Sequence, residues 1–436
     1  MKFVFSLITA KIIYFIMRIT KISDGTSIIG LLVRKFCPDF LAQANKYISI
    51  KKINVTGTNG KTTTSGIITH LIKQSNYSVI NNSMGANMLN GVINALALGI
   101  NPLKKTDYSV IELDEANVEL VFRQFDSDYM LVTNLFRDQL DRYGELATTK
   151  NFIQKGINLK QNLTLILNAD DPLVASMDGI NKIYYGMNSV SYADGFEPHS
   201  SDTEEAFNCP CGKPLKYEKK FYAQQGHYYC DCGYKRPEPK YSADVILHKT
   251  FSILKINDIE YKIPLVGLFN AYNALGAISL CLELGLKDIE KNISSFKVAF
   301  GRSEVKYLNE HKVLIQLIKN PIGANEVIKT LDLDSNLLIA INDNYADGRD
   351  VSWLWDAEFE GIRKNNKEII VSGTRAYDMA LRLKYAGVNS EKIKIIPDLK
   401  KAVDYIGRSA DNDITILPTY TALLKLNKIR KLRKWE

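Results

Sequence analysis

The sequence predicts an α/β protein in which two domains follow one another, each built on a parallel sheet, with an irregular insertion in the first. Short apolar runs alternate with segments of helical periodicity up to about residue 191 and again after residue 301, which is the pattern of βαβ units. Between residues 191 and 241 this alternation stops, and the segment is rich in Tyr, Lys, Pro and Cys. Apolar residues make up 46% and charged residues 24% of the 436 positions, which excludes a disordered or polytopic membrane chain.

The order of these patterns gives the expected domain organisation. Residues 1–46 form an N-terminal helical segment, 47–300 a first α/β domain with its insertion at 191–241, and 301–436 a second α/β domain. A parallel sheet needs buried strands separated by helices, and β-rich apolar runs supply them. The expected strands are residues 53–55, 110–113, 130–133 and 163–167 in the first domain, and 337–341, 368–371, 392–396 and 414–417 in the second.

Positive charge is concentrated at the two ends of the chain. The formal net charge is +8, and residues 1–35 and 425–436 each carry six bases and one acid, so the remainder is slightly acidic. We therefore expect no nucleic-acid partner. The basic ends instead predict peripheral contact with an anionic membrane surface.

The first 21 residues are apolar, but Lys11 and Arg18 interrupt them. The uninterrupted runs are too short for a membrane span or a signal peptide. We expect a cytoplasmic protein. Two alternatives stay open for this segment: a helix docked on the body, or an interfacial helix at the inner face of the membrane.

A glycine-containing loop between a predicted strand and a predicted helix indicates nucleotide binding rather than an ordinary tight turn. Residues 53–64 read INVTGTNGKTTT, and the glycines allow backbone N–H groups to turn inward around phosphate oxygens. The lysine would neutralise phosphate charge, and the threonine after it would bind Mg²⁺. The spacing, GxxGKT, is shorter than the general GxxxxGK(S/T) pattern. The candidate nucleotide-binding residues are Gly57, Thr58, Asn59, Gly60, Lys61 and Thr62, and Thr62 is also a candidate magnesium ligand.

Four of the six cysteines lie within 24 residues and form two near-identical CxCG motifs. Four thiolates at this spacing suit a closed tetrahedral Zn²⁺ site, and a reducing cytoplasm disfavours disulfides. Because no ligand position is left open to water, the zinc would be structural. The candidate zinc ligands are Cys209, Cys211, Cys230 and Cys232.

The loop sequence TGTNGKTTT resembles the ATP loop of the Mur ligases and folylpolyglutamate synthases, and further matches follow in the order found in those families. They are IELD at 111–114, TN at 133–134 followed by Asp138, Asp141, Arg142 and Tyr143, NADDP at 168–172, GLFNAYNA at 267–274 and GRSE at 301–304. The resemblance implies ATP and Mg²⁺ as cofactors and Glu112 as a magnesium ligand. It also implies that Asn134 belongs to the ATP site, that Asn270 contacts adenine and that Arg302 reaches phosphate. Without the resemblance, these residues are a strand-end acid, turn or cap asparagines and a surface ion pair.

Two features depart from the Mur ligase pattern. Gln139 stands where those enzymes have a histidine that binds a second Mg²⁺, which leaves a second metal site open. Lys155 matches the position of a lysine that is carbamoylated in several of them, and two alternatives stay open for it: a modified lysine or an exposed helix lysine. In addition, about 50 residues precede the ATP loop, too few for the domain that binds the UDP of their substrate. The acceptor substrate therefore has to be held in another way.

An acidic segment in the second predicted domain extends the resemblance. Residues 341–356 read INDNYADGRDVSWLWD, and from the residues alone this is a polar loop in which Asp350 caps a helix. Together with the missing UDP domain and the four-cysteine insertion, the segment resembles the MurT family, the synthetase subunits of lipid II isoglutaminyl synthase. The implied fold is a Mur ligase central ATP-binding domain with a zinc-ribbon insertion, followed by a Rossmann-like α/β domain.

The MurT resemblance implies a partner, a substrate and a reaction. The partner is a GatD-type glutaminase, whose Cys–His pair would be completed as a triad by Asp350, the candidate catalytic residue. ATP would phosphorylate the α-carboxylate of D-glutamate in the lipid II stem peptide. Ammonia from the glutaminase would then attack the acyl phosphate to give D-isoglutamine for peptidoglycan synthesis. Two alternatives stay open: an amino-acid-adding ligase of the folylpolyglutamate synthase or Mur ligase type, and a nucleotide-dependent scaffold with a degenerate ATPase.

Overall fold

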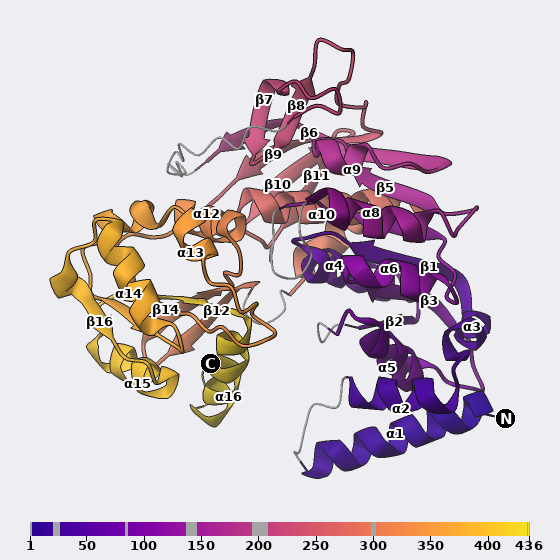
Figure 1. Cartoon of the computed structure of the whole chain (residues 1–436), viewed down its shortest axis with the longest axis horizontal. Coiled ribbons are helices and arrows are strands. Elements are labelled where there is room, and N and C mark those ends of the chain that lie inside the picture. The colour runs from indigo at the N-terminus through magenta and orange to yellow at the C-terminus, as the bar shows by residue number, and fades with distance from the viewer. Residues whose placement is uncertain are drawn as a thin grey trace.

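The computed structural model of the chain describes residues 2–20, 27–82, 86–136, 146–193, 208–297, 302–433 and 435. Within these residues the chain forms a nine-stranded sheet, a six-stranded sheet and a two-stranded hairpin. Figure 1 shows the two large sheets side by side, each with helices around it. The fold is the α/β class that the sequence predicts.

The first sheet is parallel over most of its width. Its strands are β1 (Ile48–Thr56), β2 (Val79–Asn81), β3 (Thr106–Glu112), β4 (Tyr129–Val132), β5 (Thr164–Asn168), β6 (Asn181–Tyr192), β9 (Tyr241–Leu247), β10 (Ser252–Ile256) and β11 (Ile259–Ile263). They lie in the order β11-β10-β9-β6-β5-β4-β1-β3-β2. Every pair from β2 to β9 is parallel, and β10 and β11 add to that edge antiparallel. The loops after β1, β3 and β4 therefore meet at one carboxyl edge, where such sheets bind ligands.

Helices bury both faces of this sheet. One face packs against α4 (Lys61–Gln74) and α10 (Leu268–Glu283), and the other against α5 (Leu89–Gly99), α6 (Val118–Phe122) and α8 (Leu146–Ile157). The face of α4 that packs on the sheet carries the buried side chains of Ile67, Ile68, Leu71 and Ile72. Two short helices, α9 (Pro172–Ala175) and α11 (Ile289–Asn292), follow β5 and α10.

Three further helices precede β1 and pack outside α5 (Figure 1). They are α1 (Lys2–Thr20), α2 (Ile28–Phe36) and α3 (Phe40–Ala44). The inner side of α1 is docked on the body, since Phe3 stacks on Phe40 at 4.9 Å between ring centroids and Leu7 is buried. Among the described residues, no helix has both the length and the apolar content needed to cross a bilayer.

The second sheet lies in the C-terminal part of the chain. Its strands are β12 (Arg302–Leu308), β13 (His311–Gln316), β14 (Asn336–Ala340), β15 (Ile369–Ser372), β16 (Ile393–Ile395) and β17 (Ile414–Pro418). Their order is β12-β13-β17-β14-β15-β16, and only β12 is antiparallel to its neighbour. Its helices are α12 (Pro321–Lys329), α13 (Trp353–Asp356), α14 (Ala376–Tyr385), α15 (Leu399–Ser409) and α16 (Tyr420–Arg433).

The segment between the end of β6 and the start of β9 carries the cysteines. Its described part contains an antiparallel hairpin of β7 (Lys216–Tyr222) and β8 (Gln225–Tyr229), which extends from the first sheet on the side away from α1 (Figure 1). The sequence analysis did not predict this hairpin or the strands β9 to β11. The side chains of β9, β10 and β11 alternate between buried and exposed, which is typical of strands covered on one face rather than of a parallel core buried on both faces.

Candidate functional site

Two glycines with left-handed backbone angles shape the loop between β1 and α4. Gly57 has φ +122° and Gly60 has φ +85°, angles that residues with a Cβ rarely adopt. A Cβ at Gly60 would also lie 1.8 Å from Oδ1 of Asn273 on α10. Gly60 precedes α4 without a capping side chain, and Nδ2 of Asn59 is buried with no hydrogen-bond partner in the described part of the chain. A helix N-terminus and an unsatisfied buried donor both fit an anionic ligand here.

Residues after β4 hold this loop in its shape. The Asn134 side chain accepts a hydrogen bond from the Asn59 amide at 2.9 Å and donates one to the Asn59 carbonyl at 3.1 Å. Its main-chain carbonyl accepts the Thr58 amide at 2.9 Å. The hydroxyl of Thr133 donates to the same Asn59 carbonyl at 2.7 Å. Both ends of the Asn134 amide group thus engage the loop backbone.

The loop lysine folds back onto its own loop and pairs with a buried glutamate. Nζ of Lys61 donates to the Gly57 carbonyl at 2.5 Å and lies 3.3 Å from Oε1 of Glu115. Glu115 is 5% exposed, and burial raises the pKa of its carboxyl while the Lys61 charge lowers it. Sequence analysis missed Glu115, although the run of acids at the end of β3 and just after it, at residues 112, 114 and 115, is a signal that could have found it.

Thr62 and Glu112 meet at the start of α4 and the end of β3. Oγ1 of Thr62 donates to Oε2 of Glu112 at 2.7 Å, and Nδ2 of Asn87 donates to Oε1 at 3.1 Å. Neighbouring oxygens around an octahedral Mg²⁺ lie about 2.9 Å apart, given metal–oxygen distances of 2.0–2.1 Å. The two oxygens are therefore close enough to share one ion. The sequence-predicted pair is brought together, and Asn87 is an additional contact.

Two other parts of the chain reach the loop or the first turn of α4. From α10, the Asn273 carbonyl accepts the Thr64 hydroxyl at 3.4 Å, and the nearby Asn270 side chain is buried and donates to Val266 at 2.8 Å. From the loop after β13, Nζ of Lys319 donates to the Thr58 carbonyl at 3.3 Å and Nδ2 of Asn320 donates to Oδ1 of Asn59 at 3.1 Å. Sequence analysis missed Lys319 and Asn320, because a lone Lys-Asn pair carries no specific signal.

Some predicted site residues cannot be placed. Arg302 begins β12, but its side chain lies outside the description. Gln139 and the neighbouring Asp138, Asp141, Arg142 and Tyr143 also lie outside the described residues. Lys155 is exposed in the last turn of α8.

The four cysteines of the insertion form one cluster. Their sulfur atoms all lie within 4.8 Å of one another, with 3.4 Å between Cys209 and Cys232 and 3.7 Å between Cys211 and Cys230. In a tetrahedral site with Zn–S bonds of about 2.3 Å, the sulfurs are about 3.8 Å apart. The backbone N–H of Tyr234 lowers the pKa of Cys232 to about 7, which favours its thiolate, whereas burial raises the pKa of Cys209 to about 12. The donor set and spacing fit Zn²⁺.

The same turn is built twice around this cluster. The Cys209 amide donates to Lys213 and the Gly212 amide to Cys209, at 2.7 and 2.8 Å. The Cys230 and Gly233 amides repeat the pattern at 2.8 and 3.0 Å. Gly212 and Gly233 have φ of +85° and +93°, so the glycine after each CxC is required by the turn.

The segment that contains the four cysteines and the β7–β8 hairpin is hydrogen-bonded to the turn after β5, which has the sequence NADDP. The Gly226 amide donates to the Asp170 carbonyl at 3.0 Å, and the Tyr234 hydroxyl donates to the Pro172 carbonyl at 2.8 Å. Nε2 of the buried Gln224 donates to the Leu135 carbonyl at 2.7 Å. Leu135 follows Asn134, so the hairpin contacts the segment that braces the nucleotide loop.

Asp350 lies in an exposed loop between β14 and α13, and the acids around it have different roles. The buried Asp347 accepts the Thr421 amide at 2.7 Å and the Thr421 hydroxyl, which fixes the loop to α16. Asp343 forms an ion pair with an arginine before α14 at 2.8 Å. Oδ1 of Asp350 accepts the Ser352 amide at 2.8 Å, and α13 has no side-chain cap. The helix-cap alternative for Asp350 is therefore wrong, because its carboxylate forms a local turn and faces solvent.

Comparisons with known proteins identify the family. Residues 55–281 match the Mur ligase middle domain, and residues 317–423 match the MurT ligase C-terminal family. The MurT subunit of lipid II isoglutaminyl synthase (glutamine-hydrolyzing) from Staphylococcus aureus strain COL is 38% identical over 92% of this chain and 91% of its own length. The chain belongs to the MurT family. The MurT subunit of Streptococcus pneumoniae R6 is 33% identical over 95% of this chain and 94% of its own. MurT membership makes the chain a ligase subunit, against the scaffold alternative.

Solved ligases share the fold of this MurT chain. A pseudomurein peptide ligase type C from Methanothermus fervidus has a TM-score of 0.69 at 22% identity, covering 88% of this chain and 79% of that one. MurF from Thermotoga maritima in complex with ADP has a TM-score of 0.59 at 14% identity, covering 93% and 85%. The predicted Mur-ligase-like fold with a parallel sheet is confirmed.

Proposed function

We propose that the chain is the synthetase subunit of a lipid II isoglutaminyl synthase. It transfers the γ-phosphoryl group of ATP to an oxygen of the α-carboxylate of D-glutamate in the lipid II stem peptide, giving an acyl phosphate and ADP. Ammonia attacks the acyl carbon, phosphate leaves with the electrons of the C–O bond, and a proton is lost from nitrogen. The product is the D-isoglutamine amide used in peptidoglycan. The observation that carries the proposal is the alignment with glutamine-hydrolyzing MurT subunits over 92% of the chain.

The loop after β1 is the proposed ATP site. Gly57, Thr58, Asn59 and Gly60 turn backbone N–H groups toward phosphate, Asn134 keeps the loop in shape, Asn270 lies at adenine and Arg302 reaches phosphate. The angles of Gly57 and Gly60 support this assignment, as does the unsatisfied buried Nδ2 of Asn59. Thr62 and Glu112 would hold Mg²⁺, which when bound offsets charge on the transferring group. The four cysteines would hold a structural Zn²⁺.

Lys61 is the proposed cation at the transferring phosphate. In the structure its ammonium group is held by the Gly57 carbonyl and Glu115. An incoming phosphate oxygen is a stronger acceptor than a carbonyl, because it is charged, so it takes the place of Gly57. Glu115 then keeps the ammonium group oriented. Lys319 is close enough to the same loop to add a second positive charge.

Ammonia is proposed to come from a GatD-type glutaminase subunit bound to the second sheet. Asp350 would orient the histidine of that subunit, and its exposure after β14 supports this role. A few residues further on, Trp355 stacks edge-on against Tyr385 at 5.6 Å, and these side chains are 50% and 71% exposed. Exposed aromatic side chains are enriched at protein interfaces. With Tyr377 and Leu381 on the same face of α14, they are the proposed docking surface.

Comparing two nitrogen sources tests this proposal. The chain, a glutaminase subunit, ATP and lipid II are incubated with glutamine or with an ammonium salt, and the amide is detected by mass spectrometry. Asp350→Asn should abolish glutamine-dependent amidation and leave ammonium-dependent amidation intact, because only ammonia release needs the triad. Asp356→Asn, an exposed acid in α13, is the matched control and should behave like wild type. Equal activity of Asp350→Asn with both nitrogen sources would remove the triad role.

A second variant tests the ATP site. Lys61→Ala should abolish amidation with either nitrogen source while the complex still releases ammonia from glutamine. Amidation by Lys61→Ala at the wild-type rate would contradict the phosphate role of the loop. No amide formed by the wild-type complex from either source would refute the synthetase assignment itself.

A further inference from the structure

One side of α1 carries a continuous row of exposed apolar side chains. Phe5, Ile8, Ile12, Phe15 and Ile19 are 65, 50, 54, 64 and 64% exposed. At 3.6 residues per turn they fall within an arc of about 80° and extend over about 21 Å of helix. The opposite side of α1 is packed on the body through Phe3, Leu7 and Ala10. When α1 is docked, this row of apolar side chains therefore stays exposed to water, which is unfavourable compared with burial.

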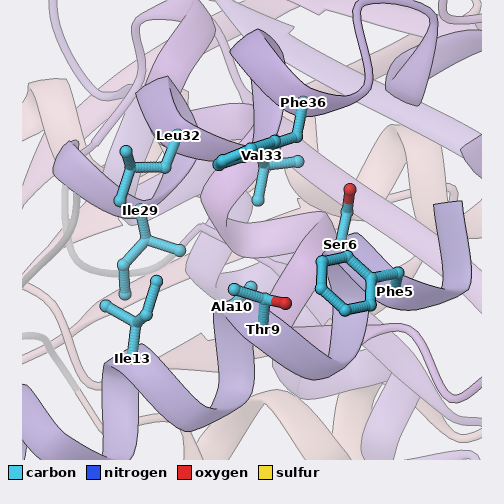
Figure 2. A pocket seen from close by; sticks show the side chains of 9 residues that line it. All are labelled: Phe5, Ser6, Thr9, Ala10, Ile13, Ile29, Leu32, Val33 and Phe36. Carbon is cyan, nitrogen blue, oxygen red and sulfur yellow. The ribbon is translucent and has the colours of Figure 1, made fainter. Parts of the chain in front are cut away.

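The row continues onto α2 and a neighbouring loop. Figure 2 shows a pocket between α1 and α2 in which seven of the nine lining side chains are apolar, with Phe5 and Phe36 among them. Phe36 itself is 62% exposed. Nζ of Lys11 ties α1 to the Ile100 carbonyl at 2.8 Å, and the loop that begins there carries Leu103, which is 94% exposed. All three segments are held on the same hydrophobic core, which includes residues of α1, α2 and Ile100.

The charges on these helices all have one sign. Neither α1 nor α2 contains an acid, and Lys2, Lys11, Arg18, Arg34 and Lys35 are exposed on them. Lys104 and Lys105 follow Leu103 and are exposed as well. On the helix, Lys2 lies to one side of the apolar row, and Lys11 and Arg18 lie to the other. Long basic side chains beside an apolar stripe are typical of helices that lie in the interface of an anionic bilayer.

We propose that α1, α2 and the loop at Leu103 form a membrane-docking surface for an anionic bilayer. The helices lie flat, the apolar row enters the acyl-chain boundary and the bases contact lipid phosphates. A second copy of the chain fits less well. A symmetric pairing of this surface would bring bases against bases with no acid on either helix to offset them. The inference stands apart from the proposed function, although a lipid-linked substrate would lie at the same surface.

Vesicle binding of the full chain tests this inference. Wild type should co-sediment with phosphatidylglycerol-containing vesicles, and less with phosphatidylcholine vesicles. Phe15→Ser/Ile19→Ser should bind at least about tenfold more weakly, because each side chain loses much of its transfer free energy. These positions are exposed and lie away from the pocket, so the fold should be kept. Ile180→Ser/Ile259→Ser is the matched control, with side chains that are 79% and 45% exposed elsewhere, and should bind like wild type.

A charge variant separates the two contributions. Arg34→Gln/Lys35→Gln should weaken binding to anionic vesicles by about fivefold per base at low salt and leave binding to phosphatidylcholine unchanged. Equal vesicle binding by wild type and Phe15→Ser/Ile19→Ser would overturn the inference. So would self-association of wild type, measured by sedimentation, that these two serines abolish in the absence of any vesicle binding. Failure of amidation with vesicle binding intact would count against the proposed function alone.

Discussion

An ion pair between Arg236 and Asp170 joins the cysteine insertion to the body of the first sheet, and Arg236→Met tests its importance. Nε of Arg236 donates to Oδ1 of Asp170 at 2.5 Å. Oδ2 accepts the Met187 amide at 2.8 Å and the Tyr272 hydroxyl at 2.9 Å. The Asp170 side chain is 0% exposed and that of Arg236 is 12% exposed. Methionine keeps most of the apolar stem and removes the only positive charge in this contact.

The expected loss of stability is about 3–5 kcal/mol at neutral pH, the usual result of leaving a buried charge without its partner. Burial raises the pKa of Asp170, and the Arg236 charge is the largest influence that lowers it. Without Arg236, the folded-state pKa rises further above that of the unfolded chain. A carboxyl with a raised pKa favours folding at low pH, and this contribution is lost as the pH rises through the folded-state value. The deficit of Arg236→Met should therefore shrink toward pH 4, roughly the ordinary carboxyl pKa.

Urea unfolding followed by intrinsic fluorescence at several pH values measures this loss. Asp170→Asn/Arg236→Met should recover much of the stability, because no buried charge remains. Lys216→Met is the matched control in the same insertion, since the Lys216–Asp231 pair is 54% and 58% exposed and solvent screening leaves it little effect on stability. The reasoning is refuted if Arg236→Met loses no more stability than Lys216→Met at neutral pH.

Three further changes have defined outcomes. Gly60→Ala should weaken ATP binding about tenfold or more in calorimetry, because the added Cβ would lie 1.8 Å from Oδ1 of Asn273 and the Gly60 φ is +85°. Adding Asn273→Gly removes the clash but not the backbone strain, so it should restore affinity only in part. Unchanged affinity in Gly60→Ala would contradict the loop geometry. Burial raises the pKa of Asp171 from 3.8 to about 6. The contribution of Asp171 to the free energy of unfolding therefore favours folding at low pH and declines by about 3 kcal/mol as the pH rises through 6. Asp171→Asn should flatten that part of the stability–pH curve, and an unchanged slope would exclude Asp171 as its source. Elemental analysis should find zinc in the purified chain, and Cys211→Ser should lower both the zinc content and the melting temperature; a zinc-free wild type would refute the four-thiolate site.

The sequence was most informative where one short motif determines both backbone and chemistry. The strand, loop and helix around residues 53–64 follow from their glycines and apolar spacing, and the meeting of Thr62 with Glu112 follows from parallel strands that end at one edge. The two CxCG motifs likewise contain the whole turn, since each glycine has the positive φ that the turn requires.

What could not be predicted depends on contacts between distant segments. Lys319 and Asn320 reach the nucleotide loop only because the second sheet packs near it, and no local pattern reports this. Asn134 matches a family motif, but its bonds to the backbone of Asn59 are visible only in the folded chain. The docked alternative for the first helix is confirmed for its inner side, and the interfacial alternative for its outer side stays a prediction. One side of this helix is buried and the other is exposed. Because both sides carry apolar residues, their periodicity alone does not show which side packs on the body.

The contact of Lys319 and Asn320 with the nucleotide loop has a consequence for how two reactions are timed. These residues lead directly into α12, in the same sheet unit that carries Asp350. Under the proposed function, ATP that binds in the loop would change the contacts of Lys319 and Asn320 with Thr58 and Asn59. Lys319 and Asn320 belong to the unit built on the second sheet, which is the proposed binding unit for the glutaminase. Occupancy of the phosphate site by ATP would then be transmitted through these contacts to the surface that completes the glutaminase. Such a linkage would let ATP binding raise the rate of glutamine cleavage above its basal value, and so limit wasted glutamine.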